Sequence, residues 1–249
     1  MAFETTSETA SGLIRELRKR ANARNRAGMA RFGINPEGTL GVSIPVIRGI
    51  AKRHRKNHEL ALKLWRTKIH EARLLAGFIE DPACVTEKQA ESWARDFDSW
   101  DVCDQVCSNV FDATPFAWKK VRQWTRRKEE FVKRAGFVLM ACLAVHDKRA
   151  QDKDFLSFLP IIKREARDER NFVRKAVNWA LRQIGKRNSA LNAAAIKTAR
   201  DISKIDFKAA RWIAADALRE LESKAVQKRL KSKESKKGLK NGLKQGLKK

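Results

Sequence analysis

Four segments of the chain repeat one helical pattern of apolar residues, and this repetition limits the folds open to it. The segments begin at Glu71, Glu130, Asn171 and Phe207. Matching positions recur 41 residues apart in Phe131 and Phe172, and 37 residues apart in Leu181 and Leu218. Intervals of roughly 20 to 50 residues are typical of solenoids, in which each repeat buries one face against the next. We therefore predict an all-α solenoid of stacked antiparallel helix pairs.

The residues between these segments fit the same scheme. Only 12 Gly and 5 Pro occur in 249 residues, too few for the turn-dense sandwiches and barrels of all-β proteins. Further helices are expected at residues 11–23, 46–53, 59–65, 87–97 and 116–127. Thr86 and Gln89 have the spacing of a capping box. Gly41 and Pro45 indicate a structured loop at residues 40–47.

The charge of the chain points to a polyanionic partner. Lys and Arg number 55 against 29 Asp and Glu, which gives a formal charge of +26. Such a charge suits DNA, RNA or an acidic membrane surface, because cations that bind phosphates release condensed counterions. Residues 224–249 contain 11 basic residues and one acid, so +16 remains on residues 1–223. We predict one domain over residues 1–223 and a basic tail, residues 224–249.

The tail is expected to be disordered in isolation, because it has few apolar residues to pack. It could act as a nonspecific nucleic-acid arm or only as a solubilising terminus. A glycine at every fourth position, Gly238, Gly242 and Gly246, disfavours an amphipathic membrane helix.

Targeting and redox features indicate an intracellular location. The first twelve residues lack the basic and then apolar pattern of a signal peptide. The longest apolar run, residues 137–145, falls well short of the roughly 20 residues that span a bilayer. The four cysteines form no Cys-x-x-Cys pair, which disfavours a zinc finger or a disulfide scaffold. We expect a cytoplasmic protein, associated with the nucleoid if bacterial, with no metal site and no membrane partner.

An acidic residue beside a tryptophan marks residues 98–111. The apolar residues that share one helical face there are Val102, Cys103, Val106, Cys107 and Val110. This face is predicted to lie against the core. Trp100 and Asp104 stand one turn apart at its edge. Asp104 is therefore expected at the boundary between core and solvent, partly removed from water.

A second tryptophan, Trp179, falls outside the apolar face of the helix predicted at residues 172–184. That face consists of Phe172, Ala176, Val177, Ala180, Leu181 and Ile184. Lys175, Arg182 and Gln183 stand three or four residues from Trp179 and so surround it on the helix surface. An aromatic side chain framed by cations suits nucleic acid. The alternative is that Trp179 packs against the next repeat and the cations are merely solvated.

Arg134 lies in a segment, residues 130–145, that is apolar on nearly every side. A charge in such a place needs a partner, because burying it unpaired is costly. The partner could be a DNA phosphate or Asp104, and the alternative is a capping or ion-pair role near the first turn of the helix. Periodicity alone favours neither.

With these residues in view, the chain resembles the DNA alkylation repair family, the AlkD-like glycosylases built from HEAT-like repeats. The resemblance rests on SWDVCD at residues 99–104, VKRAGFVLMACLAV at 132–145 and FVRKAVNWALRQIGK at 172–186. FGI at residues 32–34 and LGVSIPVIRGIAK at 40–52 precede them, and the whole spans roughly residues 10–222. It implies a superhelical solenoid of antiparallel HEAT-like repeats with a concave basic groove.

The resemblance also implies a site and an activity. Trp100, Asp104 and Trp179 match the aromatic and acidic catalytic positions of the family, and Arg134 matches its DNA-backbone-binding arginine. The expected activity is base excision repair, the hydrolytic removal of purines alkylated at ring nitrogen 3 or 7 from duplex DNA. The further cations expected to follow the DNA phosphates are Lys52, Arg53, Lys133, Arg174, Lys175, Arg182 and Arg211.

No lysine has the apolar setting of a Schiff-base nucleophile, so a monofunctional glycosylase without cofactors is expected, and the family implies a monomer. The alternative is a noncatalytic HEAT-like protein that binds bent, branched or damaged DNA. RNA binding stays open, and the charge of residues 1–223 disfavours a protein-binding scaffold.

Overall fold

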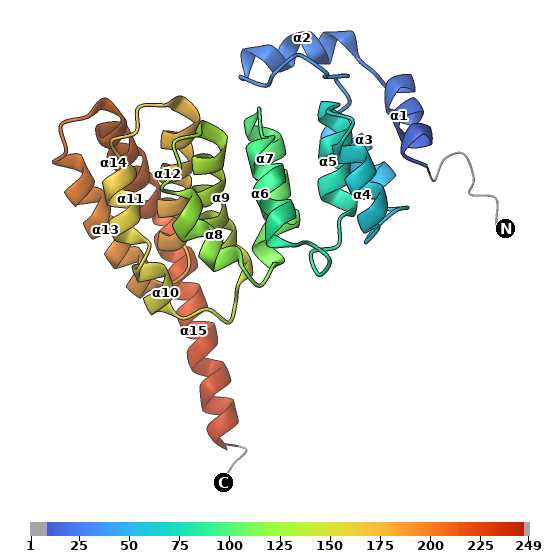
Figure 1. The fold of residues 1–249 in the computed structure, drawn as a ribbon. Helices are drawn as coiled ribbons and strands as arrows, with labels where there is room; N and C mark the ends of the chain where they lie inside the picture. Colours follow the sequence, from blue (N-terminus) through green and yellow to red (C-terminus); the bar gives the residue numbers. More distant parts are fainter. Residues whose placement is uncertain (1–8, 247–249) are drawn as a thin grey trace. The chain divides into compact units, whose positions relative to one another are not determined.

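A computed structural model describes residues 9–246 of the chain, with side chains up to residue 235. All regular structure in this range is helical and no strand occurs in it, which confirms the predicted all-α class (Figure 1). The elements are α1 (Ala10–Lys19), α2 (Ala23–Arg31), α3 (Ile44–Ala51), α4 (His58–Trp65), α5 (His70–Ile79), α6 (Glu87–Arg95), α7 (Trp100–Asn109), the 3-10 turn η1 (Phe111–Ala113), α8 (Ala117–Trp124), α9 (Glu130–His146), α10 (Asp152–Leu156), α11 (Leu159–Glu165), α12 (Asn171–Gly185), α13 (Ser189–Ser203), α14 (Lys208–Leu221) and α15 (Lys224–Gly246). Over residues 9–246, no helix has both the length and the apolar character needed to cross a membrane.

The helices form two compact units, residues 1–122 and residues 123–249. In the first unit, α5 contacts α3, α4 and α7. In the second unit, α12 contacts α9, α11, α13 and α14, and α13 packs against α14. Each unit is thus organised around one central helix, α5 in the first and α12 in the second.

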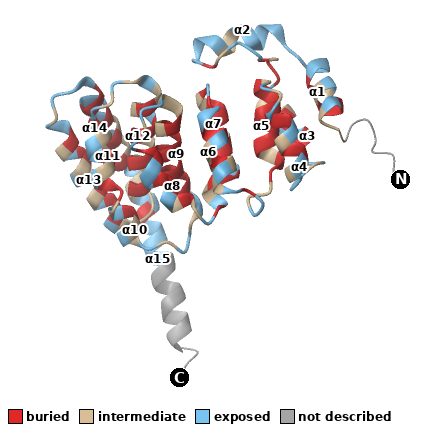
Figure 2. Ribbon diagram, in the orientation of Figure 1, coloured by how far each residue is buried: buried red, intermediate tan, exposed pale blue. Residues whose placement is uncertain are grey.

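The four segments with the repeated pattern are all helices, namely α5, α9, α12 and α14. The prediction from periodicity is therefore confirmed for these segments. Helix α9 is buried along most of its length, and the buried residues surround its axis (Figure 2). This agrees with a sequence that is apolar on nearly every side and has no wide polar face to present to water.

The helix predicted at residues 11–23 was wrong at its C-terminal end. Helix α1 ends at Lys19, and a separate helix, α2, begins at Ala23. The break has a local cause, because the side chain of Asn22 accepts a hydrogen bond of 3.0 Å from the backbone N–H of Asn25. Asparagine satisfies the exposed N–H groups of a new helix well, so it favours a start at this point over continuation.

A buried carboxylate holds the loop that precedes α3. Glu71 is fully buried on α5 and accepts hydrogen bonds from the backbone N–H groups of Leu40 at 2.8 Å, Gly41 at 2.6 Å and Val42 at 3.2 Å. Gly41 has φ of +80°, and a Cβ there would lie 2.2 Å from the carbonyl oxygen of Asn22. The predicted structured loop is confirmed for residues 40–43, whereas residues 44–47 already belong to α3. Gly41 is required both by its conformation and by this close approach.

The capping prediction at α6 is confirmed in its first half. Thr86 Oγ1 accepts a hydrogen bond of 3.1 Å from the backbone N–H of Gln89, as an N-cap should. The side-chain amide of Gln89 donates a hydrogen bond of 2.8 Å to the carboxylate of Glu80, the C-cap residue of α5. Thr86 thus starts α6, and Gln89 links it to the end of α5.

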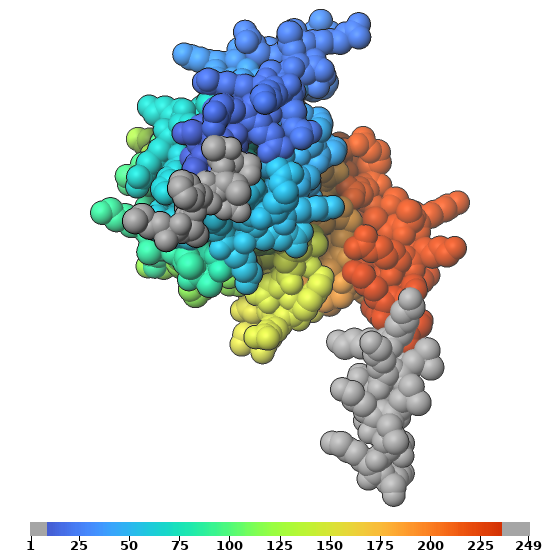
Figure 3. Space-filling view, turned by 90° about the vertical axis from the view of Figure 1, so that its right-hand side faces the viewer, coloured from blue at the N-terminus to red at the C-terminus, as the bar shows by residue number. Residues whose placement is uncertain are grey.

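The tail begins as a helix that contacts the second unit. Helix α15 packs against α14, and the coloured residues nearest the C-terminus form one red-orange surface in the space-filling view (Figure 3). Leu230 is 2% exposed, so the first turns of α15 bury an apolar side chain. The side chains of residues 236–249, which include the repeated glycines, lie outside the described residues. The domain boundary at residue 223 stays a prediction.

Gly136 allows α9 to approach the end of α8. A Cβ at this position would stand 2.7 Å from the backbone nitrogen of Thr125 and 3.1 Å from the carbonyl carbon of Trp124. Gly136→Ala is expected to lower the free energy of unfolding by about 1 to 3 kcal/mol, because backbone atoms cannot yield without repacking. The measurement is urea unfolding followed by circular dichroism.

Gly49→Ala in α3 is the matched control, because a Cβ there meets nothing within 4 Å. It should stabilise the protein by up to about 1 kcal/mol, the ordinary preference of a helix for alanine. Equal shifts of the same sign in both variants would contradict the packing role of Gly136.

Candidate functional site

Helix α7 carries the first two predicted site residues, Trp100 and Asp104. Its apolar face is fully buried, as predicted, with Val102, Cys103, Val106, Cys107 and Val110 all at 0% exposure. Trp100 and Asp104 are half-buried and stand one turn apart beside this face. The indole Nε1 of Trp100 donates a hydrogen bond of 3.0 Å to the carbonyl oxygen of Phe32. The carboxylate is thus placed at the boundary between core and solvent, next to an anchored aromatic ring.

A cavity of about 450 Å³ lies beside Trp100 in the first unit. Its walls come from α2, from the loop before α3 and from α7, and they include Met29, Phe32 and Gln105. Phe32 is 71% exposed, so a large aromatic ring stands at the surface beside the cavity. Asp101 lines this cavity. A mostly apolar cavity with a few polar groups is a common form of ligand site.

A buried polar cluster, which the sequence analysis missed, holds the start of α7 against α5. His70 Nε2 lies 2.8 Å from Asp101 Oδ2, and the Ser99 hydroxyl lies 3.5 Å from His70 Nδ1. Burial lowers the pKa of His70, but the hydrogen bond and charge of Asp101, with the charges of Glu71 and Asp98, more than offset it. The pKa of His70 is therefore raised above its ordinary value. Since Trp100 lies between Ser99 and Asp101, this cluster fixes its backbone.

Arg134 belongs to the second unit, where it joins α9 to α12. It is 6% exposed, and its guanidinium donates a hydrogen bond of 2.6 Å to the carbonyl oxygen of Phe172. The rings of Phe131 and Phe172 lie 5.4 Å apart beside it. Arg134 therefore has a partner within the protein, the carbonyl group of Phe172 in the first turn of α12. Its contact with a DNA phosphate stays a prediction.

Trp179 lies on α12 outside the buried face, as predicted. Ala176, Val177, Ala180, Leu181 and Ile184 are all fully buried. Val173 is fully buried at the start of the helix, whereas Phe172, predicted to be buried, is only half-buried. Trp179 is half-buried and Lys175, one turn before it, is exposed. Part of the indole therefore faces solvent beside a cation.

Several of the cations predicted to bind DNA are paired within the protein. Lys133 Nζ lies 2.7 Å from Glu165 and 3.3 Å from Asp168. Arg182 lies 2.5 Å from Glu220 and 3.4 Å from Asp216. On the surface, Arg53 pairs with Glu16 at 2.7 Å and Arg211 pairs with Asp206 at 2.6 Å. Lys52 and Lys175 are exposed and form no ion pair within residues 9–235.

Arg174 stands apart from these pairs because it lies over an aromatic ring. Its guanidinium carbon is 5.3 Å from the ring centre of Trp212 on α14, a cation–π distance. Trp212 is 38% exposed, and the sequence analysis did not select it. One turn further along the contact between α12 and α14, Asn178 donates a hydrogen bond of 2.6 Å to Asp216. The contact between α12 and α14 thus places Arg174 and Trp212 at the surface, next to the hydrogen bond between Asn178 and Asp216.

Trp100 and Asp104 belong to the first unit, and Arg134 and Trp179 belong to the second. Within the first unit the structure brings Trp100 and Asp104 together on α7. Within the second, the hydrogen bond of Arg134 to Phe172 connects it to the helix that carries Trp179.

Comparisons with known proteins bear on these observations. The model of a family described as DNA alkylation repair enzyme matches residues 13–227. No curated protein matches the chain. Among solved structures, the chain is similar to one described as "A new family of proteins related to the HEAT-like repeat DNA glycosylases with affinity for branched DNA structures". The TM-score is 0.72 at 20% identity, and the match covers 85% of this chain and 95% of that one. This similarity confirms the predicted HEAT-like repeat fold.

The raised pKa of His70 makes the anchoring of α7 sensitive to pH. A histidine with a raised folded-state pKa contributes stability that is full below its unfolded value of about 6.5 and is lost as pH rises through the folded-state pKa. The difference in unfolding free energy between wild type and His70→Gln should therefore be largest in acid and shrink toward high pH. Urea unfolding between about pH 5 and pH 9 measures it. A difference that stays constant over this range would contradict the ion pair.

Proposed function

Because the chain belongs to the DNA alkylation repair enzyme family, we propose that it is a DNA glycosylase that removes N3- or N7-alkylated purines from duplex DNA. The observation that carries the proposal is the half-buried carboxylate of Asp104 one turn from the anchored indole of Trp100. Trp179 beside exposed Lys175 on α12 and the charge of +26 add support. The substrate is then a cationic base in a polyanionic chain.

The chemistry of the substrate decides what the protein must supply. A purine alkylated at nitrogen 3 or 7 is already positively charged, so it leaves as a neutral base without being protonated. When the N-glycosidic bond breaks, its electron pair goes to the base and positive charge develops on the deoxyribose. Water then adds to C1′ and loses a proton. The barrier therefore lies in stabilising a sugar cation.

Asp104 fits this task as the catalytic residue of the proposal. A carboxylate held at the edge of the core is only partly hydrated, so its charge acts on a nearby cation more strongly than in bulk water. The same oxygen atoms can orient the attacking water and accept its proton. One side chain can thus serve both the breaking of the bond and the addition of water.

The two tryptophans are proposed to hold the lesion-bearing nucleotide. An indole face contacts a deoxyribose closely and attracts the positive charge that develops there. The hydrogen bond from Trp100 to the carbonyl of Phe32 limits the orientations of its ring. Arg134 and the exposed cations Lys52 and Lys175 are proposed to bind backbone phosphates, contacts that position the duplex without reading its sequence.

The proposed reaction is hydrolysis alone, without strand cleavage. A lyase step needs a lysine amine that is neutral and free to attack the sugar. Lys120 is a buried lysine, 4% exposed, but its ammonium group lies 2.7 Å from Glu91 and 3.2 Å from Glu87. An ammonium group held between two carboxylates is not free to attack a sugar. These observations support a monofunctional enzyme.

Asp104→Asn is expected to lower the rate of base release by about 10²- to 10⁴-fold, because it removes the charge that stabilises the sugar cation. Duplex binding should stay within about twofold of wild type, since the variant loses no cation. The measurement is release of methylated purines from DNA treated with a methylating agent. Glu59→Gln removes an exposed carboxylate of α4 in the same unit and should leave the rate unchanged.

Equal release by wild type and Asp104→Asn would keep the enzyme and discard the role of Asp104. No release by wild type would discard the enzyme.

The similarity to a chain described by its affinity for branched DNA favours a second candidate, a noncatalytic protein that binds branched or bent DNA. The basic surface serves this function without Asp104. The second candidate predicts that a four-way junction binds more than about tenfold tighter than a duplex of equal length and that no base is released. The glycosylase proposal predicts base release and a junction preference below that margin. Fluorescence anisotropy at fixed salt measures both affinities.

A further inference from the structure

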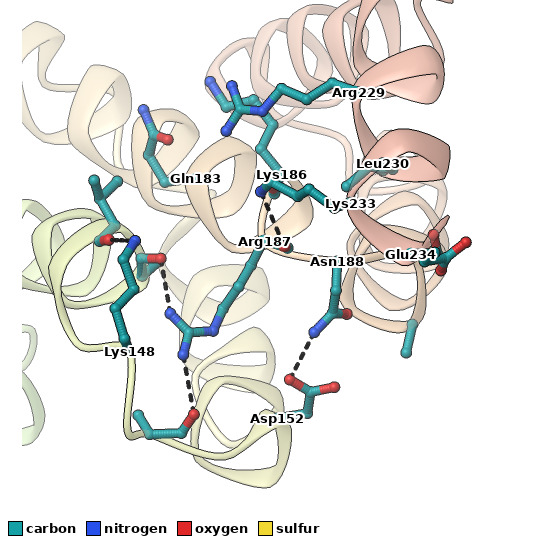
Figure 4. A pocket seen from close by; sticks show the side chains of 15 residues that line it. Lys148, Asp152, Gln183, Lys186, Arg187, Asn188, Arg229, Leu230, Lys233 and Glu234 are labelled. Carbon is teal, nitrogen blue, oxygen red and sulfur yellow. Dashed lines mark hydrogen bonds between the residues drawn. The ribbon is translucent and has the colours of Figure 1, made fainter. Parts of the chain in front are cut away.

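A basic cavity of about 660 Å³ lies in the second unit, where the ends of α9 and α12 meet the starts of α13 and α15 (Figure 4). The cationic side chains that line it are Lys148, Lys186, Arg187, Arg229 and Lys233. The carboxylates that line it are Asp152 and Glu234. None of these seven residues belongs to the site proposed above, so the cavity is a separate feature of the protein.

Part of this charge is already engaged by protein partners. Lys186 Nζ lies 2.6 Å from Glu220, and Asp152 accepts a hydrogen bond of 2.8 Å from the side-chain amide of Asn188. The charged side chains that remain are four cations, Lys148, Arg187, Arg229 and Lys233, against the two carboxylates of Asp152 and Glu234. The cavity therefore carries an excess of positive charge.

Backbone carbonyl groups hold three of these cations in place. Lys148 donates a hydrogen bond to the carbonyl oxygen of Val145. Arg187 donates hydrogen bonds of 3.0 Å to the carbonyl oxygens of Ala144 and Ala150, and its guanidinium lies 4.4 Å from the ring centre of Phe155. Lys233 donates hydrogen bonds of 3.1 Å to the carbonyl oxygens of Lys186 and Arg187 (Figure 4). The C-terminal end of a helix attracts cations, so α12 draws Lys233 of α15 into the cavity.

The cations repel one another across the cavity. Burial lowers the pKa of Lys233, and the charges of Arg229, Lys148 and Arg187 lower it further. Such repulsion weakens when an anion enters, because the anion interacts favourably with all of the cations at once. The start of α13 adds to the effect, since Ser189 and Ala190 line the cavity at the positive end of a 15-residue helix.

The cavity continues the face of α12 that carries Trp179. Gln183, one turn after Trp179, lines the cavity. Lys186 follows Trp179 by seven residues, about 10 Å along the helix axis at 1.5 Å per residue. Successive phosphates of one strand advance about 3.4 Å along a duplex. A duplex that contacts Trp179 and runs along α12 toward the C-terminal end of this helix has backbone phosphates about three base pairs away within reach of the cavity.

We propose that this cavity binds a backbone phosphate of duplex DNA, about three base pairs from the nucleotide at Trp179. The inference rests on the proposed contact of Trp179 with DNA and assigns to the flanking duplex a contact outside the catalytic residues. It also assigns a function to the first turns of the tail, which supply Arg229 and Lys233. The phosphate accepts hydrogen bonds from the unbalanced cations, chiefly Lys148 and Arg229.

The test removes two exposed cations of the cavity in the double variant Lys148→Gln/Arg229→Gln and leaves Lys233, which is held by the carbonyl groups at the end of α12. Losing one phosphate contact should reduce the magnitude of the slope of log K against log salt concentration by about 0.9. The same relation predicts affinity about eightfold weaker at 0.1 M salt. Fluorescence anisotropy with an unmodified duplex of about 20 base pairs measures both quantities, and circular dichroism checks that the variant is folded.

The matched control is the double variant Lys153→Gln/Lys228→Gln. It removes two exposed cations from α10 and α15, the elements next to the cavity, but neither side chain lines it. Its affinity for the duplex should stay within about twofold of wild type. The loss of two cations outside the cavity weakens the long-range attraction between protein and DNA only slightly, because salt screens it. Equal weakening by the two double variants, or no weakening by the first, would overturn the proposal.

Inorganic phosphate separates DNA binding from capture of a free anion. Stabilisation of wild type by millimolar phosphate, lost in the Lys148→Gln/Arg229→Gln variant while duplex affinity stays unchanged, would assign the cavity to a free anion and overturn the proposal. The duplex used here is unmodified, so the result does not depend on catalysis. If wild type releases no alkylated base and the salt slope still falls by about 0.9, the glycosylase proposal fails and the phosphate site stands.

Discussion

The burial of one apolar face on each repeated helix against neighbouring helices is the constraint on which the rest of the structure depends. On α12 the buried face runs from Val173 to Ile184, and on α7 it runs from Val102 to Cys107 and ends at the C-cap residue Val110. Only the remaining part of each helix surface can hold a ligand. Trp179 and Asp104 stand beside these buried faces, where the packed core fixes the backbone and water reaches the side chain. The proposed site therefore follows from how the repeats pack.

Buried polar groups then determine which neighbouring segments each helix contacts, a choice that apolar packing alone does not make. A fully buried charge is tolerated only with partners, so each one specifies a particular neighbour. Glu71 specifies the loop before α3 through three N–H groups, and His70 specifies the start of α7 through Asp101. Arg134 specifies the first turn of α12 through the carbonyl of Phe172. These contacts orient the helices that carry the proposed site residues.

Periodicity predicted the helices and their buried faces because both depend on residues three or four apart in the sequence. It could not predict the partners of buried charges, which come from other helices: Asp101 follows His70 by 31 residues, and Phe172 follows Arg134 by 38. The break between α1 and α2 was missed because Asn22 gives a weak local signal inside an otherwise helical pattern. Trp100, Asp104 and Trp179 could be selected because each departs from the pattern around it.

Net charge predicts the class of molecule that binds the protein. Where that molecule binds depends on which cations are already paired with carboxylates of the protein. Lys133 and Arg182 are largely neutralised by nearby carboxylates, so they add little to the field outside the protein. The cations around Lys233 repel one another, and an anion between them lowers the energy of the whole group. Asp104 is the converse case in the proposed site, because a half-buried carboxylate beside Trp100 interacts favourably with a positive charge. In the proposed mechanism, the loss of a cationic purine produces such a charge on the sugar.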